Sequence, residues 1–148
     1  MSTQENKQLC QKGYELFMRG AIPELLSFYH DDAVWIQPEM DHTPYGGMHR
    51  TKAGIASFFQ KLNDTLELVA MKPEQYIAEG DKVVVTGQAT WKARATGIRF
   101  DSPWVHLFTV RDGKVAMAQM WSDTAASEHA LRPTAAARGA RPQPEARH

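Results

Sequence analysis

Residues 13–38, GYELFMRGAIPELLSFYHDDAVWIQP, predict two helices followed by a strand. Apolar residues recur on one helical face up to Gly20, a residue type that often ends a helix, and Pro23 is typical of the start of the next one. The segment 33–37, AVWIQ, is β-branched and aromatic and therefore favours a strand. This order of helix, helix and strand decides the fold.

The remainder of the chain adds one long helix, four strands and a short helix. Residues 43–62, TPYGGMHRTKAGIASFFQKL, predict a loop and then a helix capped by Thr51. Beyond this helix the apolar period changes to two, and four extended runs are separated by the turn signals Gly80-Asp81, Thr96-Gly97 and Asp112-Gly113. A short helix is expected over 124–131. The chain is thus predicted to be an α+β domain, with helices against one side of a strongly curved antiparallel sheet.

Composition excludes several classes of protein. The chain has 148 residues, and its 43% hydrophobic and 23% charged residues are typical of one globular domain. No apolar run approaches the roughly 20 residues that cross a bilayer, so no membrane partner is expected. Lys and Arg together number 17, as do Asp and Glu, so no net positive charge attracts nucleic acid. Because Cys10 is the single cysteine and no apolar signal precedes it, a cytoplasmic location is expected.

The charge is unevenly distributed along the chain. Residues 132–148, RPTAAARGARPQPEARH, contain four arginines and one glutamate but no large apolar side chain. This basic segment rich in Pro, Ala and Arg cannot support a packed core, so it is predicted to be a disordered tail after a domain of residues 1–131.

Three segments resemble a known family. They are 13–38 and 43–62, quoted above, and 106–123, HLFTVRDGKVAMAQMWSD. They are similar to the SnoaL-like polyketide cyclase branch of the NTF2-like superfamily, which has a ketosteroid-isomerase-like fold, and the likeness extends over residues 5–128. The resemblance implies a cone in which a curved sheet wraps around the N-terminal helices, encloses an apolar pocket and forms a homodimer.

The resemblance also assigns working positions. The tyrosine of the isomerases corresponds to Gly13, their catalytic base to Gln37 and their late-strand aspartate to His106. Gly13 therefore widens the pocket, and Gln37 can orient a ligand but cannot act as a general base. Tyr14 is next to the empty tyrosine position, but adjacent helical residues project about 100° apart, so Tyr14 is not expected simply to take over that position.

A cyclase-like pattern pairs the histidine with an acid on the last strand. The expected last strand, 115–122, contains no acid, and the residue nearest to the inward position is Gln119 or Trp121. Trp104, His106 and Phe108 alternate with period two and should share the pocket face. Trp35, Trp104 and Trp121 would supply flat aromatic walls, although core packing also explains these tryptophans.

His106 is the residue most suited to chemistry. An imidazole with the ordinary pKa near 6.5 can donate through one nitrogen and accept through the other, and so can polarise a carbonyl or carry a proton. A histidine hydrogen-bonded within the pocket wall fits the same sequence equally well.

No metal or cofactor is expected. His42 and His49, with Glu39 and Asp41, lie in a Gly-Pro loop at a spacing that matches no standard zinc pattern. Gly46-Gly47 lacks the lysine of a phosphate-binding loop.

The sequence thus predicts a cofactor-independent pocket enzyme of the isomerase, cyclase or dehydratase (lyase) type acting on a small apolar cyclic molecule. His106 would be the acid or base, and Gln37 and Tyr14 would orient the substrate. The alternative is a non-catalytic module that binds a ligand or a protein. A second copy of the chain is expected to cover the outward sheet face, with Val83, Val85 and Val105 among its apolar residues.

Overall fold

The computed structural model describes residues 2–132, and its elements follow the predicted order except for one additional strand at residues 47–50, where the sequence predicted a loop. The helices are α1 (Thr3–Met18), α2 (Ile22–Leu26), α3 (Thr51–Thr65) and α4 (Thr124–Leu131); the strands are β1 (Tyr29–Gln37), β2 (Gly47–Arg50), β3 (Leu66–Glu79), β4 (Lys82–Ala93), β5 (Arg99–Arg111) and β6 (Lys114–Ser122). The tail predicted at 132–148 lies outside the described residues, except for Arg132. None of the helices within 2–132 has both the length and the apolar character needed to cross a bilayer.

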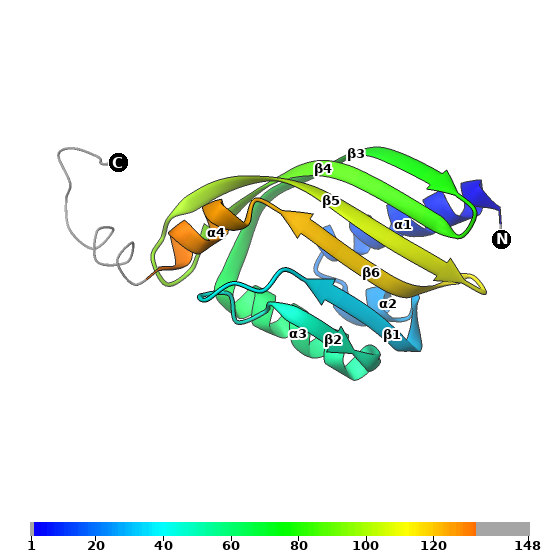
Figure 1. The fold of residues 1–148 in the computed structure, drawn as a ribbon, viewed down its shortest axis with the longest axis horizontal. Helices are drawn as coiled ribbons and strands as arrows, with labels where there is room; N and C mark the ends of the chain where they lie inside the picture. Colours follow the sequence, from blue (N-terminus) through cyan, green and yellow to red (C-terminus); the bar gives the residue numbers. More distant parts are fainter. Residues whose placement is uncertain (1, 133–148) are drawn as a thin grey trace.

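The six strands form one curved sheet in the order β2-β1-β6-β5-β4-β3, which confirms the predicted α+β class (Figure 1). Neighbouring strands are antiparallel except β1 and β6, which are parallel. The parallel contact arises because α3 carries the chain from one edge of the sheet to the other, and the β3–β6 meander then returns its last strand beside β1. The sheet is therefore mixed, where the sequence predicted an antiparallel one.

Helices cover the concave side of this sheet. α1 packs on β3 and β4, and α3 packs on β1 (Figure 1). A capping box between Ser2 and Glu5 starts α1, and the hydroxyl of Thr51 accepts a hydrogen bond from the Gly54 N–H at the start of α3. These local contacts set where the helices begin, and their apolar faces then close one wall of a cavity.

Two valines lie on the opposite face of the sheet from the one that the sequence predicted. Val83 and Val85 are 0% exposed and pair with Phe108 and His106, so they point to the concave side. Placing these two valines on the outward face was wrong, whereas Val105 does lie there and is 39% exposed. Directly opposed residues of paired strands share a face, so the inward position of His106 brings Val85 inward with it.

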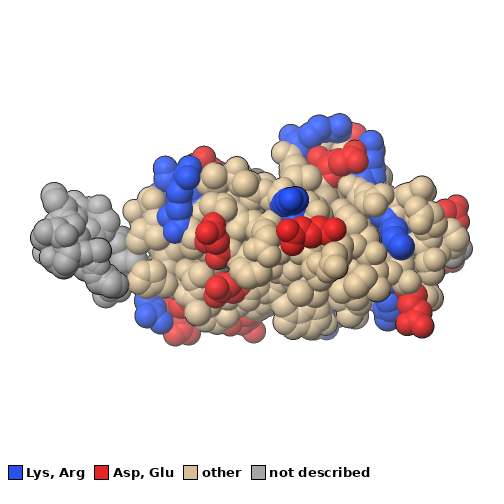
Figure 2. Space-filling model, turned by 90° about the horizontal axis from the view of Figure 1, so that it is seen from above, with Lys and Arg blue, Asp and Glu red and all other residues tan. Residues whose placement is uncertain are grey.

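Figure 2 shows positive and negative side chains mixed over one face of the molecule, with broad uncharged areas between them. No extended patch of a single sign is visible on that face.

Candidate functional site

A cavity of about 120 Å³ lies between the concave face of the sheet and the helices. Its walls are mainly aromatic and aliphatic side chains, and no Asp, Glu, Lys or Arg of the described range lines it. The lining residues with a hydroxyl, amide or imidazole group are Tyr14, Tyr29, Gln37, Tyr45, Ser102, His106, Ser122 and Ser127. A cavity of about 150 Å³ can hold one benzene molecule, so this space matches one small ring.

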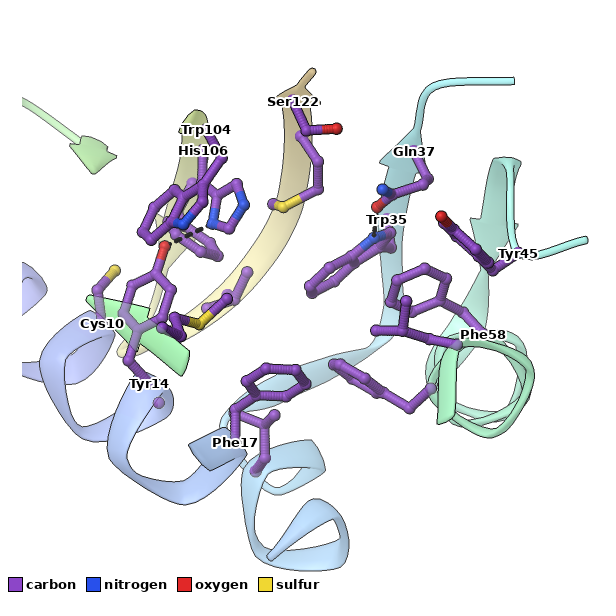
Figure 3. Close-up of a pocket in the computed structure, with 18 of the residues that line it drawn as sticks. Cys10, Tyr14, Phe17, Trp35, Gln37, Tyr45, Phe58, Trp104, His106 and Ser122 are labelled. Atoms are coloured by element: carbon purple, nitrogen blue, oxygen red, sulfur yellow. Dashed lines mark hydrogen bonds between the residues drawn. The ribbon is translucent and has the colours of Figure 1, made fainter. Parts of the chain in front are cut away.

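The centre of the site is a contact between α1 and β5. The hydroxyl oxygen of Tyr14 lies 2.6 Å from Nδ1 of His106, and the two rings are nearly parallel, 11° apart (Figure 3). The indole of Trp104 stacks on the rings of both Tyr14 and His106, and its centroid lies 4.1 Å from that of His106. The rings of Tyr14 and Trp104 hold the imidazole in one orientation.

Tyr14 lines the cavity together with Gly13, although adjacent helical residues project about 100° apart. Cys10, Gly13, Tyr14 and Phe17 all line the cavity, at helical spacings of three, four and seven residues. A buried helical stripe is at least about 100° wide, so adjacent Gly13 and Tyr14 both fit within it. Gly13 leaves space in this wall, and Tyr14 reaches across to His106.

Burial keeps the ionisable groups of the cavity uncharged at neutral pH. It lowers the pKa of His106 to about 3, which replaces the value near 6.5 assumed from the sequence. It raises the pKa of Tyr14 well above 10, and it raises those of Cys10 and Tyr45 to about 12. The imidazole is therefore neutral and the phenol keeps its proton.

A second polar group lies on β1. The Trp35 Nε1–H donates to Oε1 of Gln37 over 3.1 Å, which orients the amide so that its NH₂ group remains available (Figure 3). The Trp35 ring packs on Phe58 with centroids 4.8 Å apart. Phe108 lines the cavity beside His106, as its alternation with Trp104 and His106 predicted.

Gln119 and Trp121 do not line the cavity, so this part of the predicted pocket is wrong. Met120 is the residue of β6 that pairs with His106 and faces the cavity. Since side chains alternate along a strand, Gln119 and Trp121 take the outer face, where Trp121 is 45% exposed. A shift of one residue reverses the face of every side chain in a strand.

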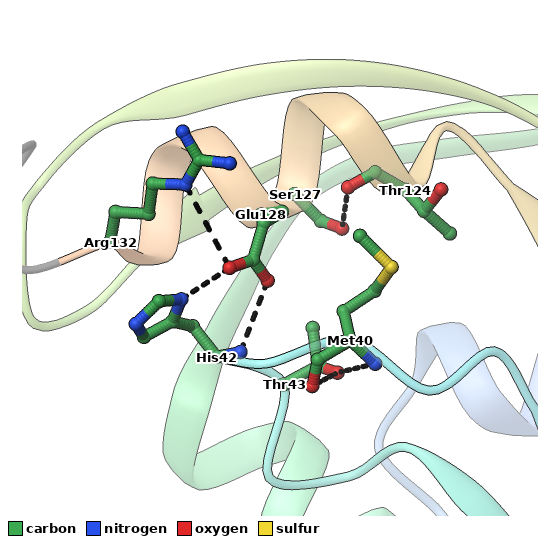
Figure 4. Close-up of polar contacts among 7 residues, drawn as sticks. All are labelled: Met40, His42, Thr43, Thr124, Ser127, Glu128 and Arg132. Carbon is green, nitrogen blue, oxygen red and sulfur yellow. Dashed lines mark hydrogen bonds and ion pairs between the residues drawn. The ribbon is translucent and has the colours of Figure 1, made fainter.

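The loop between β1 and β2 is held against α4 by a buried carboxylate (Figure 4). Glu128, 5% exposed, accepts hydrogen bonds from the backbone N–H of His42, over 3.1 Å, and from the His42 ring. Nε of Arg132 lies 3.8 Å from the same carboxylate. Burial alone would raise the pKa of Glu128, but the hydrogen bonds from His42 and the charge of Arg132 outweigh it and lower that pKa.

The contacts of this loop also account for the histidines considered as metal ligands. His42 binds Glu128, and Nε2 of His49 lies 2.8 Å from the carbonyl oxygen of Tyr45. Within the described range no three His, Cys, Asp or Glu side chains gather as a metal site. No sequence pattern pointed to Glu128, because a lone glutamate in a short helix is ordinarily solvated.

Sequence reasoning missed five cavity residues that carry a hydroxyl group: Tyr29, Tyr45, Ser102, Ser122 and Ser127. Serine is common on protein surfaces, and nothing in the spacing of these serines distinguishes them. Tyr45 belongs to the Gly-Pro loop, whose composition is typical of functional loops but does not single out any one residue.

The chain is similar to known proteins both in its sequence and in its structure. The sequence profile described as "SnoaL-like domain" matches residues 11–118. An NTF2-like protein from Burkholderia xenovorans LB400 is 34% identical with a TM-score of 0.81, covering 89% of this chain and 99% of that one. TerC, co-crystallised with polyporic acid, is 29% identical with a TM-score of 0.78, covering 86% of this chain and 98% of TerC.

A more distant likeness shows the fold alone. It is to a Mesorhizobium loti protein provisionally assigned as a SnoaL-like polyketide cyclase, 20% identical with a TM-score of 0.67, covering 82% of this chain and 99% of that one. A search of curated protein sequences gives no significant match.

Proposed function

Because the chain belongs to the SnoaL-like domain family of the NTF2-like superfamily, we propose that it is a cofactor-independent enzyme acting on a small, apolar, cyclic molecule. The reaction class is an isomerisation, cyclisation or dehydration that proceeds by acid–base chemistry at His106. One observation carries this proposal: a neutral imidazole is held by a tyrosine within a cavity that is otherwise apolar.

The cavity walls supply binding and the polar groups supply orientation. Trp35, Trp104 and Phe108 offer flat or edge-on aromatic surface to a ring. The Gln37 NH₂ group can hold a substrate oxygen at one end, while His106 acts at another. In a water-poor site a fixed N–H donor interacts more strongly with developing charge than it does in water.

Ligand size follows from the cavity volume. About 120 Å³ admits one small ring, so a larger substrate requires displacement of wall side chains. The co-crystallisation of TerC with polyporic acid supports a small organic molecule as the occupant.

The second candidate is a non-catalytic ligand-binding module. It is favoured by one observation, that no carboxylate lines the cavity to act as a general base. The two candidates differ in whether a bound molecule is chemically changed.

Turnover of cyclic ketones and hydroxyketones by the purified full chain, followed by absorbance and mass spectrometry, separates these candidates. For a converted compound, His106→Leu is expected to lower kcat/KM by about 100-fold or more, because the acid–base group is lost. The exposed His129→Leu is the matched control and should retain activity. Binding without product, or equal turnover by His106→Leu, would contradict the enzymatic proposal.

We also propose a homodimer formed through the outer sheet face. Val105, Met117 and Trp121 are 39%, 39% and 45% exposed there, and apolar residues grouped on one face favour an interface. Light scattering is expected to give about twice 16.6 kDa, and Trp121→Glu to give a monomer. Met18→Glu, at the exposed end of α1, should remain dimeric. A monomeric wild-type protein at tens of micromolar would refute this assembly.

A further inference from the structure

We propose that Tyr14 is a positioning residue that fixes His106 as the Nε2–H tautomer, so that the imidazole presents the cavity with a hydrogen-bond donor. The corresponding ligand is an uncharged molecule that places an acceptor oxygen on this N–H. The assignment of the tautomer concerns the folded protein alone; the ligand class rests on the proposed function of the cavity.

The hydrogen bond between Tyr14 and His106 has two possible directions. Either the phenol donates to Nδ1, or Nδ1–H donates to the phenol oxygen. The hydroxyl of Tyr14 contacts no other hydrogen-bond partner among residues 2–132, and Tyr14 is 7% exposed. In the second direction the hydroxyl hydrogen would be buried without an acceptor, so the first direction is favoured.

The protonation states are consistent with this direction. Burial raises the pKa of Tyr14 and lowers that of His106, so the phenol keeps its hydrogen and the imidazole carries a single one. With Nδ1 accepting from Tyr14, that single hydrogen must be on Nε2.

Nε2 is the nitrogen that faces the cavity (Figure 3). It makes no hydrogen bond to any side chain or backbone group of the described chain, and Met120 lies opposite it on β6. Trp104 Nε1–H is also without a partner in the described residues, but this atom is buried. The Nε2–H is therefore a donor that only water or a ligand can satisfy.

The surroundings select against charged ligands. No cationic side chain of the described residues lines the cavity. A ligand carboxylate would therefore lose its bound water and gain only uncharged hydrogen-bond donors in return, which disfavours its binding. The Gln37 amide, whose oxygen already accepts from Trp35, offers its NH₂ group from β1. Both polar ends of the cavity thus present N–H groups, which match uncharged acceptor oxygens.

The tautomer can be measured without a substrate. Long-range ¹⁵N–¹H NMR on the labelled full-length chain at pH 7 is expected to show a pyridine-like Nδ1 and a pyrrole-like Nε2 for His106. Tyr14→Phe should give a mixed pattern, and Tyr76→Phe should keep the wild-type pattern. Tyr76 is the matched control because its ring packs edge-on against Tyr14, with centroids 6.1 Å apart, but makes no hydrogen bond to His106.

Ligand class is tested with three probes of one ring: acetophenone, ethylbenzene and benzoate. Acetophenone should bind about tenfold more tightly than ethylbenzene or benzoate, and Tyr14→Phe should reduce this preference to less than about threefold.

A pyrrole-like Nδ1 in the wild type overturns the inference, even if the chain has activity and even if Tyr14→Phe fails to fold. Equal binding of the three probes, or binding of none, overturns the ligand class. Conversely, the expected tautomer and probe preference without turnover of any compound would uphold the inference and refute the enzymatic proposal.

Discussion

Replacing Gly87 with alanine is expected to lower the free energy of unfolding by about 3 kcal/mol, the upper end of the usual cost of overpacking. An added Cβ would lie 2.3 Å from Cζ2 of Trp104 and 2.5 Å from the carbonyl oxygen of Lys72. Neither atom is on a flexible side-chain end. Trp104 is 5% exposed and stacked on His106, and the other atom belongs to the β3 backbone. The absent side chain at Gly87 therefore makes room for the indole that supports His106.

Chemical denaturation followed by tryptophan fluorescence measures this effect. Gly54→Ala is the matched control, since its Cβ would have its nearest contact at 3.7 Å and the residue lies within α3. This control should be neutral or stabilising by up to about 1 kcal/mol. Similar unfolding midpoints for Gly87→Ala and wild type would contradict this prediction, because they would show that β4 and Trp104 can shift to admit the added methyl group at little cost.

Acidification from pH 6.5 to 4.5 is expected to destabilise the wild-type chain by about 2 kcal/mol more than a His106→Asn variant. The pKa of His106 is about 3 when folded and near 6.5 when unfolded. Between these values the unfolded chain binds a proton that the folded chain excludes, so stability falls as the pH falls. Above pH 6.5 both states are neutral and this contribution is absent.

Urea denaturation at pH 6.5, 5.5 and 4.5 tests this expectation. Comparing the change with pH in each variant, rather than absolute stability, removes any constant effect of the substitution on packing. Glu128 also loses stabilisation as the pH falls through its lowered pKa, but this loss is common to both proteins. His129→Asn, an exposed histidine, should behave as wild type. Equal acid sensitivity of wild type and His106→Asn would mean that the imidazole is freely hydrated.

Most of the fold could be predicted because its signals are local. The turn pairs at Gly80-Asp81, Thr96-Gly97 and Asp112-Gly113 correctly divide β3 to β6, and α4 lies where it was predicted. β1 begins at Tyr29 rather than Ala33, because Tyr29 pairs with Val115 of β6. The acidic pair that no local pattern favours lies in the irregular stretch between this pair and the next one, Val34 with Met117. Asp32 is then held by Arg111, 79 positions away in the sequence.

The site could be predicted only in part. Period-two spacing correctly grouped Trp104, His106 and Phe108, because alternation is a property of any extended chain. The same rule gave the wrong residues on β6, where Met120 rather than Gln119 or Trp121 faces the cavity. Alternation states which residues share a face, but not which face is covered by helices.

Local chemistry in the chain thus specifies the helix starts, the turns and the alternation, since each depends on a few neighbouring residues. Packing decides the rest. The Tyr14–His106 hydrogen bond joins residues 92 positions apart, and the neutral state of that imidazole follows from its removal from water. Both depend on how α1 lies across the sheet, because distance and solvation are set by the assembled chain and not by any segment of it.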